Sequence, residues 1–243
     1  GTVALTTDTQ GSRSVAVGRG TLGAQNFTSS QETYNTAVGY DAGASVTTGV
    51  QNTLIGGLAG DAITDADFNI AIGYGALGAN TVGSKSVAIG QGALVLQNPG
   101  SATDMHNVAI GHQAGNDITT GAGNTFVGSE AGDKTDDGVN NTAVGYLSLG
   151  ANCGNDNTVV GVLTGSVCTG ADNTLMGASA GSTVTSGSNN LLLGHDAGKS
   201  GEPGGSVTTQ SNIVALGNSN ITSLNCQVAL TVASDERDKT DFT

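Results

Sequence analysis

The sequence predicts an all-β fold, a parallel β-solenoid of about twelve short rungs. The first observation is a motif that recurs along nearly the whole chain, with a basic step of 17 residues between motif glycines such as Gly39, Gly56 and Gly73. The second is composition, because 40 of 243 residues are Gly, there is no Trp, and only 3% are aromatic. Small side chains must therefore stack where a globular core would use rings, which is typical of solenoids.

The repeating unit reads Asn-Thr-(Ala/Leu)-(Val/Ile)-Gly-x-x-Ala-Gly, as in 35–43 and 52–60. Further copies begin at Asn69, Ser86, Asn107, Asn124, Asn141, Asn157, Asn173 and Asn190, with degenerate copies at Ser14 and 212–217. Longer steps insert residues at 25–34, 98–106 and 199–210, which we interpret as loops. A rung this short has no room for a helix and two turns, so each rung is predicted to hold two short strands.

The first predicted strand is the Asn-Thr-x-(Val/Ile) segment, and the second includes the segments 46–49, 118–121 and 184–187. Residues one and three after the Asn should point to one face and the residue between them to the other. Both faces are apolar. One lies inside the coil and the other needs a cover, which we expect to be copies of the same chain in a parallel homotrimer, with a different partner chain as the alternative.

The motif glycines suit tight turns that need a positive φ or a close backbone approach. The recurring Asn suits a ladder at a bend, where its amide bonds the Asn of the next rung. We expect both to be structural, because a ligand does not need a dozen copies of one turn.

The formal net charge is −13, the pI is about 4.1, and only seven residues are Lys or Arg. This balance excludes the basic surface that binds nucleic acid and indicates a solvated acidic rod. No segment has the roughly 20 apolar residues of a membrane helix, so we expect no membrane insertion. The chain begins Gly1-Thr2-Val3 without Met or a signal peptide, and we expect it to be part of a longer protein.

The three cysteines, Cys153, Cys168 and Cys226, have no CxxC spacing and no neighbouring His, so we predict no metal and no cofactor. Cys168 occupies the place of Val or Ile in other rungs and is expected to be buried. A bridge between Cys153 and Cys168 is an alternative.

The position just after the motif Gly holds a ring in several rungs, and these rings should align along one edge of the rod. They are Tyr40, Tyr74, His112, Tyr146 and His195. One interpretation is a receptor surface for a host glycan or protein. The other is that the rings pack against a neighbouring subunit or cover strand edges.

A polysaccharide hydrolase needs paired carboxylates in a cleft, with aromatic platforms for sugar rings. The carboxylates here fall in variable turns, where Asx-turns explain them: Asp61, Asp65, Asp67, Asp133, Asp136 and Asp137. We therefore predict no enzyme. Calcium in these turns is an alternative without the Gly-Gly-x-Gly-x-Asp repeat that would support it. A column of Thr invites an ice-binding interpretation, which we discount because the Thr alternate with apolar residues on the expected inner face.

The strings at 86–93 (Ser-Val-Ala-Ile-Gly-Gln-Gly-Ala) and 107–114 (Asn-Val-Ala-Ile-Gly-His-Gln-Ala) resemble the head repeats of trimeric autotransporter adhesins. The resemblance covers about residues 12–217. It implies a left-handed parallel β-roll that packs as a trimer.

The segment Ser-Asp-Glu-Arg-Asp-Lys at 234–239 resembles the junction of phage tail fibres and endosialidases that carry a C-terminal intramolecular chaperone. In that family the chaperone trimerises, guides folding and is removed by self-cleavage. The resemblance implies Ser234 as nucleophile and Lys239 as its general base, with Asp235 and Arg237 completing the junction motif. We expect the chaperone to lie beyond Thr243, so that cleavage occurs only in the full-length protein.

The predicted organisation is a solenoid over 1–217, a connector over 218–233 and the start of the chaperone junction over 234–243. The predicted function is a structural segment of a viral tail fibre that extends or presents the receptor-binding part, located in the virion. The alternative is the head of a bacterial trimeric adhesin, located at the cell surface and binding host matrix or glycan.

Overall fold

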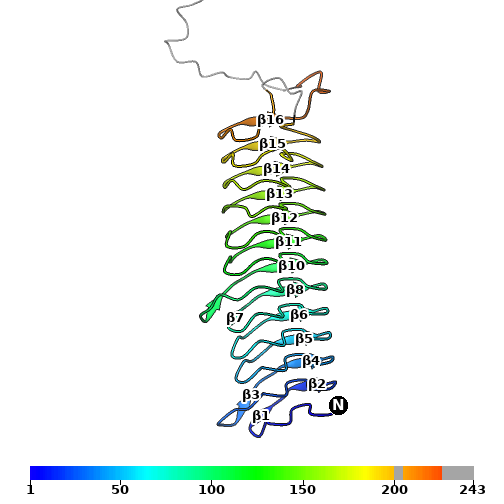
Figure 1. Ribbon diagram of the computed structural model, residues 1–243, viewed down its shortest axis with the longest axis vertical. Coiled ribbons are helices and arrows are strands. Elements are labelled where there is room, and N and C mark those ends of the chain that lie inside the picture. Colours follow the sequence, from blue (N-terminus) through cyan, green and yellow to red (C-terminus); the bar gives the residue numbers. More distant parts are fainter. Residues whose placement is uncertain (200–204, 226–243) are drawn as a thin grey trace, which may run out of the picture.

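A computed structural model describes residues 1–199 and 205–225, and these residues wind into a tall stack of similar rungs (Figure 1). Every regular element in this part of the chain is a β-strand. Twelve three-residue strands form one parallel sheet: β2 (Val15–Val17), β4 (Thr36–Val38), β5 (Thr53–Ile55), β6 (Ile70–Ile72), β8 (Val87–Ile89), β10 (Val108–Ile110), β11 (Thr125–Val127), β12 (Thr142–Val144), β13 (Thr158–Val160), β14 (Thr174–Met176), β15 (Leu191–Leu193) and β16 (Val214–Leu216). The predicted all-β parallel solenoid is confirmed, with about 11 turns.

The strands stack in strict register, each pairing only with the strands of the rungs before and after it. In the pairing of β4 with β5, Ala37 lies beside Leu54 and Val38 beside Ile55. A slip by one residue would turn every inward side chain outward, so the apolar pattern itself specifies this register.

Two inserted loops add residues outside the stack without disturbing it. The first loop contains β3 (Gln31–Glu32), which pairs with β1 (Gly11–Ser12) of the preceding rung, and the second contains β9 (Thr103–Asp104), which pairs with β7 (Gly83–Ser84) of the preceding rung. Figure 1 shows the second pair projecting from the side of the solenoid.

The middle residue of each strand points into the coil. Leu54, Ala88, Phe126 and Leu192 are examples, each with no exposed surface. A second inner column follows the corner, with Val46, Ile63, Ile118, Cys168 and Val184 fully buried. The core is therefore one side chain deep on each wall, which explains the low aromatic content.

The predicted second strand of each rung is wrong. Residues 46–49, 118–121 and 184–187 form bends rather than strands. The reason is visible in the first of them, where the N–H groups of Thr47, Thr48 and Gly49 all donate to the one carbonyl of Thr64, at 2.8, 3.3 and 3.2 Å. A ladder needs one acceptor for each donor, whereas convergence on a single carbonyl marks a tight corner.

The expected place of the Thr column is also wrong. Thr36, Thr53 and Thr125 lie on the outward side of their strands and are partly exposed, while the residue that follows each is buried. The middle residue of a three-residue strand faces one way and its two neighbours the other, so a buried middle residue sends Thr outward.

The predicted Asn ladder is present and buried. Asn35 accepts a hydrogen bond from the backbone N–H of Asn52 at 2.9 Å, and Asn52 accepts one in turn from Asn69 at 2.9 Å. The Asn52 Nδ2 group donates to the carbonyl of Ala66 at 2.8 Å. Each side chain thus ties one rung to the next and closes the corner of its own rung.

The last strand, β16, ends at Leu216, near the predicted end of the solenoid at 217. Only the first part of the predicted connector, up to residue 225, falls within the described residues. The predicted junction at 234–243 lies outside them.

Candidate functional site

The first and third residues of the twelve strands form a continuous outward face of Val, Ile, Leu and Met with six Thr, called here the outer face. Its first column is Val15, Thr36, Thr53, Ile70, Val87, Val108, Thr125, Thr142, Thr158, Thr174, Leu191 and Val214. Its third-residue column is Val17, Val38, Ile55, Ile72, Ile89, Ile110, Val127, Val144, Val160, Met176, Leu193 and Leu216. Side chains of Ile55, Ile110, Val144 and Met176 are 36–43% exposed. This face has no cover from the described residues of its own chain.

The outer face is bordered on one side by the residue after each motif glycine, a column called here the trailing edge. Its members are Arg19, Tyr40, Gly57, Tyr74, Gln91, His112, Ser129, Tyr146, Val162, Ala178, His195 and Asn218. The five rings singled out from the sequence therefore share one column. Tyr40, Tyr74 and Tyr146 are 47–60% exposed, and their backbone carbonyls are held in line by N–H groups of the next rung, such as Leu58 to Tyr40 at 2.8 Å.

The opposite border, called here the leading edge, is the residue two positions before each of the twelve strands, a column that the sequence-based interpretation did not single out. Its members are Arg13, Tyr34, Gln51, Phe68, Lys85, His106, Gly123, Asn140, Asp156, Asp172, Asn189 and Asn212. Tyr34 and Phe68 are 44% and 46% exposed, and His106 is exposed. The signal was present in the repeat, since all twelve occupy the same motif position.

Every leading-edge residue adopts a left-handed backbone conformation, with φ of 51° at Tyr34, 60° at Phe68 and 53° at His106. Bulky residues pay a steric cost of about 1 kcal/mol or more in this region, whereas Gly does not. Gly123 carries no such cost and the five Asn and Asp residues tolerate this region, but the rings of Tyr34 and Phe68 do not favour it. Rings therefore occupy this corner although its backbone conformation favours glycine.

The two arginines of the first rung each contact a tyrosine of the second. The Arg13 guanidinium lies 5.3 Å from the centroid of the Tyr34 ring, and that of Arg19 lies 5.5 Å from the centroid of Tyr40. Arg13 also pairs with Glu32 at 2.7 Å. Both borders of the outer face thus begin with the same cation–π contact.

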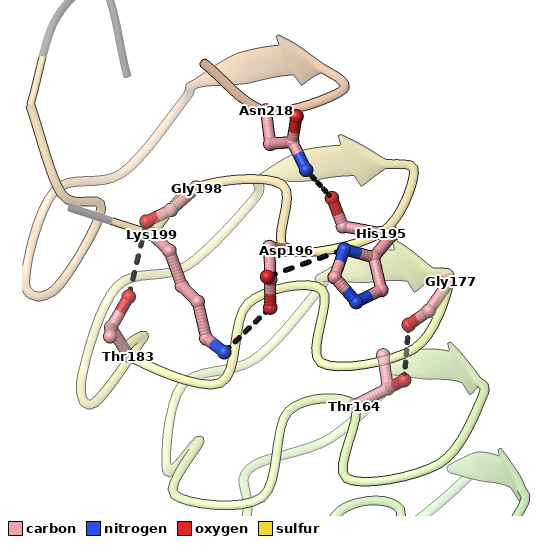
Figure 2. Close-up of polar contacts among 8 residues, drawn as sticks. All are labelled: Thr164, Gly177, Thr183, His195, Asp196, Gly198, Lys199 and Asn218. Carbon is pink, nitrogen blue, oxygen red and sulfur yellow. Dashed lines mark hydrogen bonds and ion pairs between the residues drawn. The ribbon is translucent and has the colours of Figure 1, made fainter. Parts of the chain in front are cut away.

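His195, the last ring of the trailing edge, belongs to a polar corner (Figure 2). Its Nδ1 atom lies 3.2 Å from Oδ2 of Asp196, whose Oδ1 accepts a hydrogen bond from Lys199 at 2.6 Å. The Lys199 hydrogen bond lowers the pKa of Asp196 below its ordinary value. The Asn218 side chain donates to the His195 carbonyl at 3.0 Å, which ties this corner to the next rung.

The acidic residues of the turns are spread over several rungs. Asp133 is nearly buried, and desolvation raises its pKa, although Lys134 lies 3.5 Å away. Burial likewise raises the pKa of Asp61. No group of three or more His, Cys, Asp or Glu side chains suited to a metal ion occurs within residues 1–199 and 205–225.

Cys153 and Cys168 are buried and unbridged, and Cys168 takes the inner place predicted for it. Cys153 lies 3.2 Å from the Thr135 hydroxyl, and burial raises the pKa of its thiol to about 11. The predicted junction residues Ser234, Asp235, Arg237 and Lys239 lie outside the described residues, as does Cys226.

No helix within the described ranges is long and apolar enough to cross a membrane. Comparison with protein-family models, with curated proteins and with solved structures yields no match.

Proposed function

We propose that this protein is a structural segment of a viral tail fibre, a homotrimeric rod that extends or presents the receptor-binding part in the virion. The outer face carries the proposal, because an apolar surface that runs the length of a rod needs a cover of the same length. Eleven rung steps of about 4.8 Å make that length about 53 Å.

The size of the outer face supports a stable contact. Strands about 10 Å long, stacked over about 53 Å, give a face on the order of 500 Å². This lies near the upper end of the apolar patches that monomeric proteins expose. Three such faces turned toward a common axis bury about 1,500 Å² in all, or about 500 Å² for each of the three pairs of chains, so the residues that border the face must extend each contact to reach the size of a standard stable interface.

A second copy of the chain fits this face better than an unrelated partner does. Every copy has the same rung spacing, so rows of Val and Ile on parallel copies stay level along the whole rod. The acidic surface, with net charge −13, keeps the other sides of the rod apart. Closed cyclic symmetry then covers every apolar face without leaving a free one.

Sedimentation equilibrium of the chain tests the assembly, and we expect three times the mass of 23.7 kDa. Val144→Glu, on the outer face, should convert the trimer to monomers, because it places three carboxylates close together in an apolar interface. Val167→Glu is the matched control, since Val167 is 43% exposed but lies outside the outer face. A monomeric wild-type chain would contradict the trimer.

We further propose that the full-length protein matures by self-cleavage at Ser234, with Lys239 as general base and Asp235 and Arg237 in the junction. The match of Ser, Asp, Arg and Lys in the segment that follows the predicted connector supports this role. The test is a chain extended past Thr243, in which Ser234→Ala should abolish cleavage. Cleavage that survives this substitution would exclude Ser234 as nucleophile.

The adhesin head stays the alternative, and the sequence that follows residue 243 separates the two. An adhesin continues into a coiled-coil stalk and a membrane anchor, whereas a fibre continues into a chaperone. The resemblance of the repeats favours the adhesin head, whereas the resemblance of the segment 234–239 favours the fibre.

The outward Thr column is the one observation that favours ice binding, because it removes our reason for discounting it. The adjacent column contains only Val, Ile, Leu and Met, without a hydroxyl, and so favours protein packing. Thermal hysteresis is the measurement that separates the two roles. Hysteresis in a monomeric protein would favour ice binding over the fibre.

A further inference from the structure

In three rungs, rings occupy both borders of the outer face, while the β12 and β15 rungs carry a ring on the trailing edge alone, Tyr146 and His195. The β4 rung carries Tyr34 and Tyr40, the β6 rung carries Phe68 and Tyr74, and the β10 rung carries His106 and His112. The intervening β5 and β8 rungs carry a ring on neither border. The repeat itself does not require this match, because the two positions belong to different corners.

The two rings of one rung cannot pack on each other within a chain. A strand about 10 Å long and the corner at each end separate them. Stacked or edge-to-face rings need centroids about 4.5–7 Å apart. A shared rung therefore points to contact between chains rather than inside one.

We infer that the leading-edge rings of one copy pack on the trailing-edge rings of the next copy at the same rung. Rotation about an axis parallel to the rod changes no height, so a parallel cyclic assembly places Phe68 beside Tyr74 of the adjacent copy. An antiparallel pair instead reverses the order of the rungs and sets unlike levels side by side.

The backbone supports the same contact. Phe68, Tyr34 and His106 occupy a left-handed corner at which Gly costs least. A strained conformation persists where the surroundings compensate for it, and within its own chain Phe68 remains 46% exposed. Burial against the next copy would stabilise Phe68 in this conformation, in addition to the hydrogen bond that its backbone N–H donates to the Val50 carbonyl at 3.1 Å.

This inference rests on the proposed trimer and adds the residues that set its register and direction. It assigns the trailing-edge rings Tyr40, Tyr74 and His112 to the contact between copies. A host receptor is the competing occupant of the same rings, and the experiment below separates the two.

The experiment joins the two borders covalently in a Cys226→Ser background. The double variant Phe68→Cys/Tyr74→Cys places one thiol on each border of the same rung. After mild oxidation, a denaturing gel without reductant should show a closed covalent trimer. Each single variant should stay monomeric on that gel, because the facing border of the adjacent copy carries no introduced thiol.

The matched control is Tyr34→Cys/Tyr74→Cys, which exchanges the same kinds of ring in rungs two levels apart. It should give roughly tenfold less covalent trimer, since an offset of about 9.6 Å exceeds the Cα separation of about 7 Å that a disulfide spans. Equal yields from the two double variants, or none from either in a protein that sediments as a trimer, would overturn the ring contact and leave the rings to a receptor.

The outcomes also separate this inference from the fibre proposal. A covalent product that stays at two chains after complete oxidation supports the contact between borders but contradicts the trimer. A wild-type chain that sediments as a monomer contradicts both.

A second measurement is the thermal midpoint of Phe68→Ala, Tyr74→Ala and their double variant. Non-additive shifts indicate rings in contact, and additive shifts contradict that contact.

Discussion

The Nδ2 group of Asn107 donates a hydrogen bond to Oε1 of Gln97 at 2.9 Å inside the solenoid. The rung of Gln97 is one of two that begin with Ser, here Ser86, in place of the usual Asn. Ser86 also donates to Gln97, at 3.1 Å. The side chain of Gln97 thus stands in for the missing amide of the ladder.

The first rung repeats this arrangement, which shows that the exchange is systematic. It begins with Ser14, and Gln25 accepts a hydrogen bond from Asn35 at 2.9 Å. Gln25 and Gln97 occupy the inner position that holds Val46 in a standard rung. Where the ladder position holds Ser in place of the longer Asn, the inner position across the coil holds Gln in place of Val.

Replacing Gln97 by Val should lower the free energy of unfolding by about 1–3 kcal/mol, because Asn107 and Ser86 lose a buried acceptor. Adding Ser86→Asn rebuilds a standard rung and should recover most of the loss. Denaturant unfolding of the single and double variants measures the coupling. Gln91→Ala, an exposed change in the same rung, is the control, and strictly additive losses would contradict the exchange.

Removing one Asn of the ladder should be costly. Asn124 accepts from the Asn141 N–H at 2.8 Å and donates to the Gly138 carbonyl at 2.8 Å. Asn124→Ala leaves two buried backbone groups without partners, at about 1–3 kcal/mol each. Hydrogen exchange should show the loss of protection centred on the β11 and β12 rungs. Asp137→Ala, an exposed change in the same rung without a left-handed backbone, should change stability much less, and an equal effect would argue against the ladder.

Gly56→Ala should strongly destabilise the protein. Gly56 has φ of +134°, and an added Cβ would lie 2.6 Å from the carbonyl oxygen of Gly73 in the next rung. Backbone cannot yield as a side chain can, so the rungs must separate locally. Gly57→Ala is the matched control, since its Cβ would meet only the Tyr74 ring, at 3.4 Å. Equal melting temperatures for the two variants would contradict this account.

Cys153 should resist thiol reagents at neutral and mildly alkaline pH while the protein is folded. Its folded pKa is about 11, mainly because burial disfavours the thiolate. A raised pKa favours folding below the unfolded pKa of about 8.5, and this contribution declines as the pH rises from there toward 11. The rate of thiol labelling in a Cys226→Ser background, with and without denaturant, measures the resistance of the folded protein to thiol reagents. Rapid labelling of the folded protein at pH 8 would show that the thiol is accessible.

The sequence predicted the solenoid well because its signal is local and repeated. The spacing of Asn35, Asn52 and Asn69 sets the rung length, and a buried middle residue sets the register. The same reasoning failed at 46–49, since β-branched residues there suggested a strand. Their N–H groups converge on one carbonyl of the next rung. The sequence does not predict which carbonyl accepts the hydrogen bond of a given N–H group.

The sequence by itself determined the rung, its parallel stacking and the alignment of rings such as Tyr40 and Tyr74 in one column. Only the tertiary structure decided which side of each strand faces out, and hence that Thr lies on the outer face. It also brought Tyr34 and Phe68 to the opposite border. The physical reason is that a period of two residues distinguishes two faces without saying which is inside, and only closure of the coil around its core settles that choice.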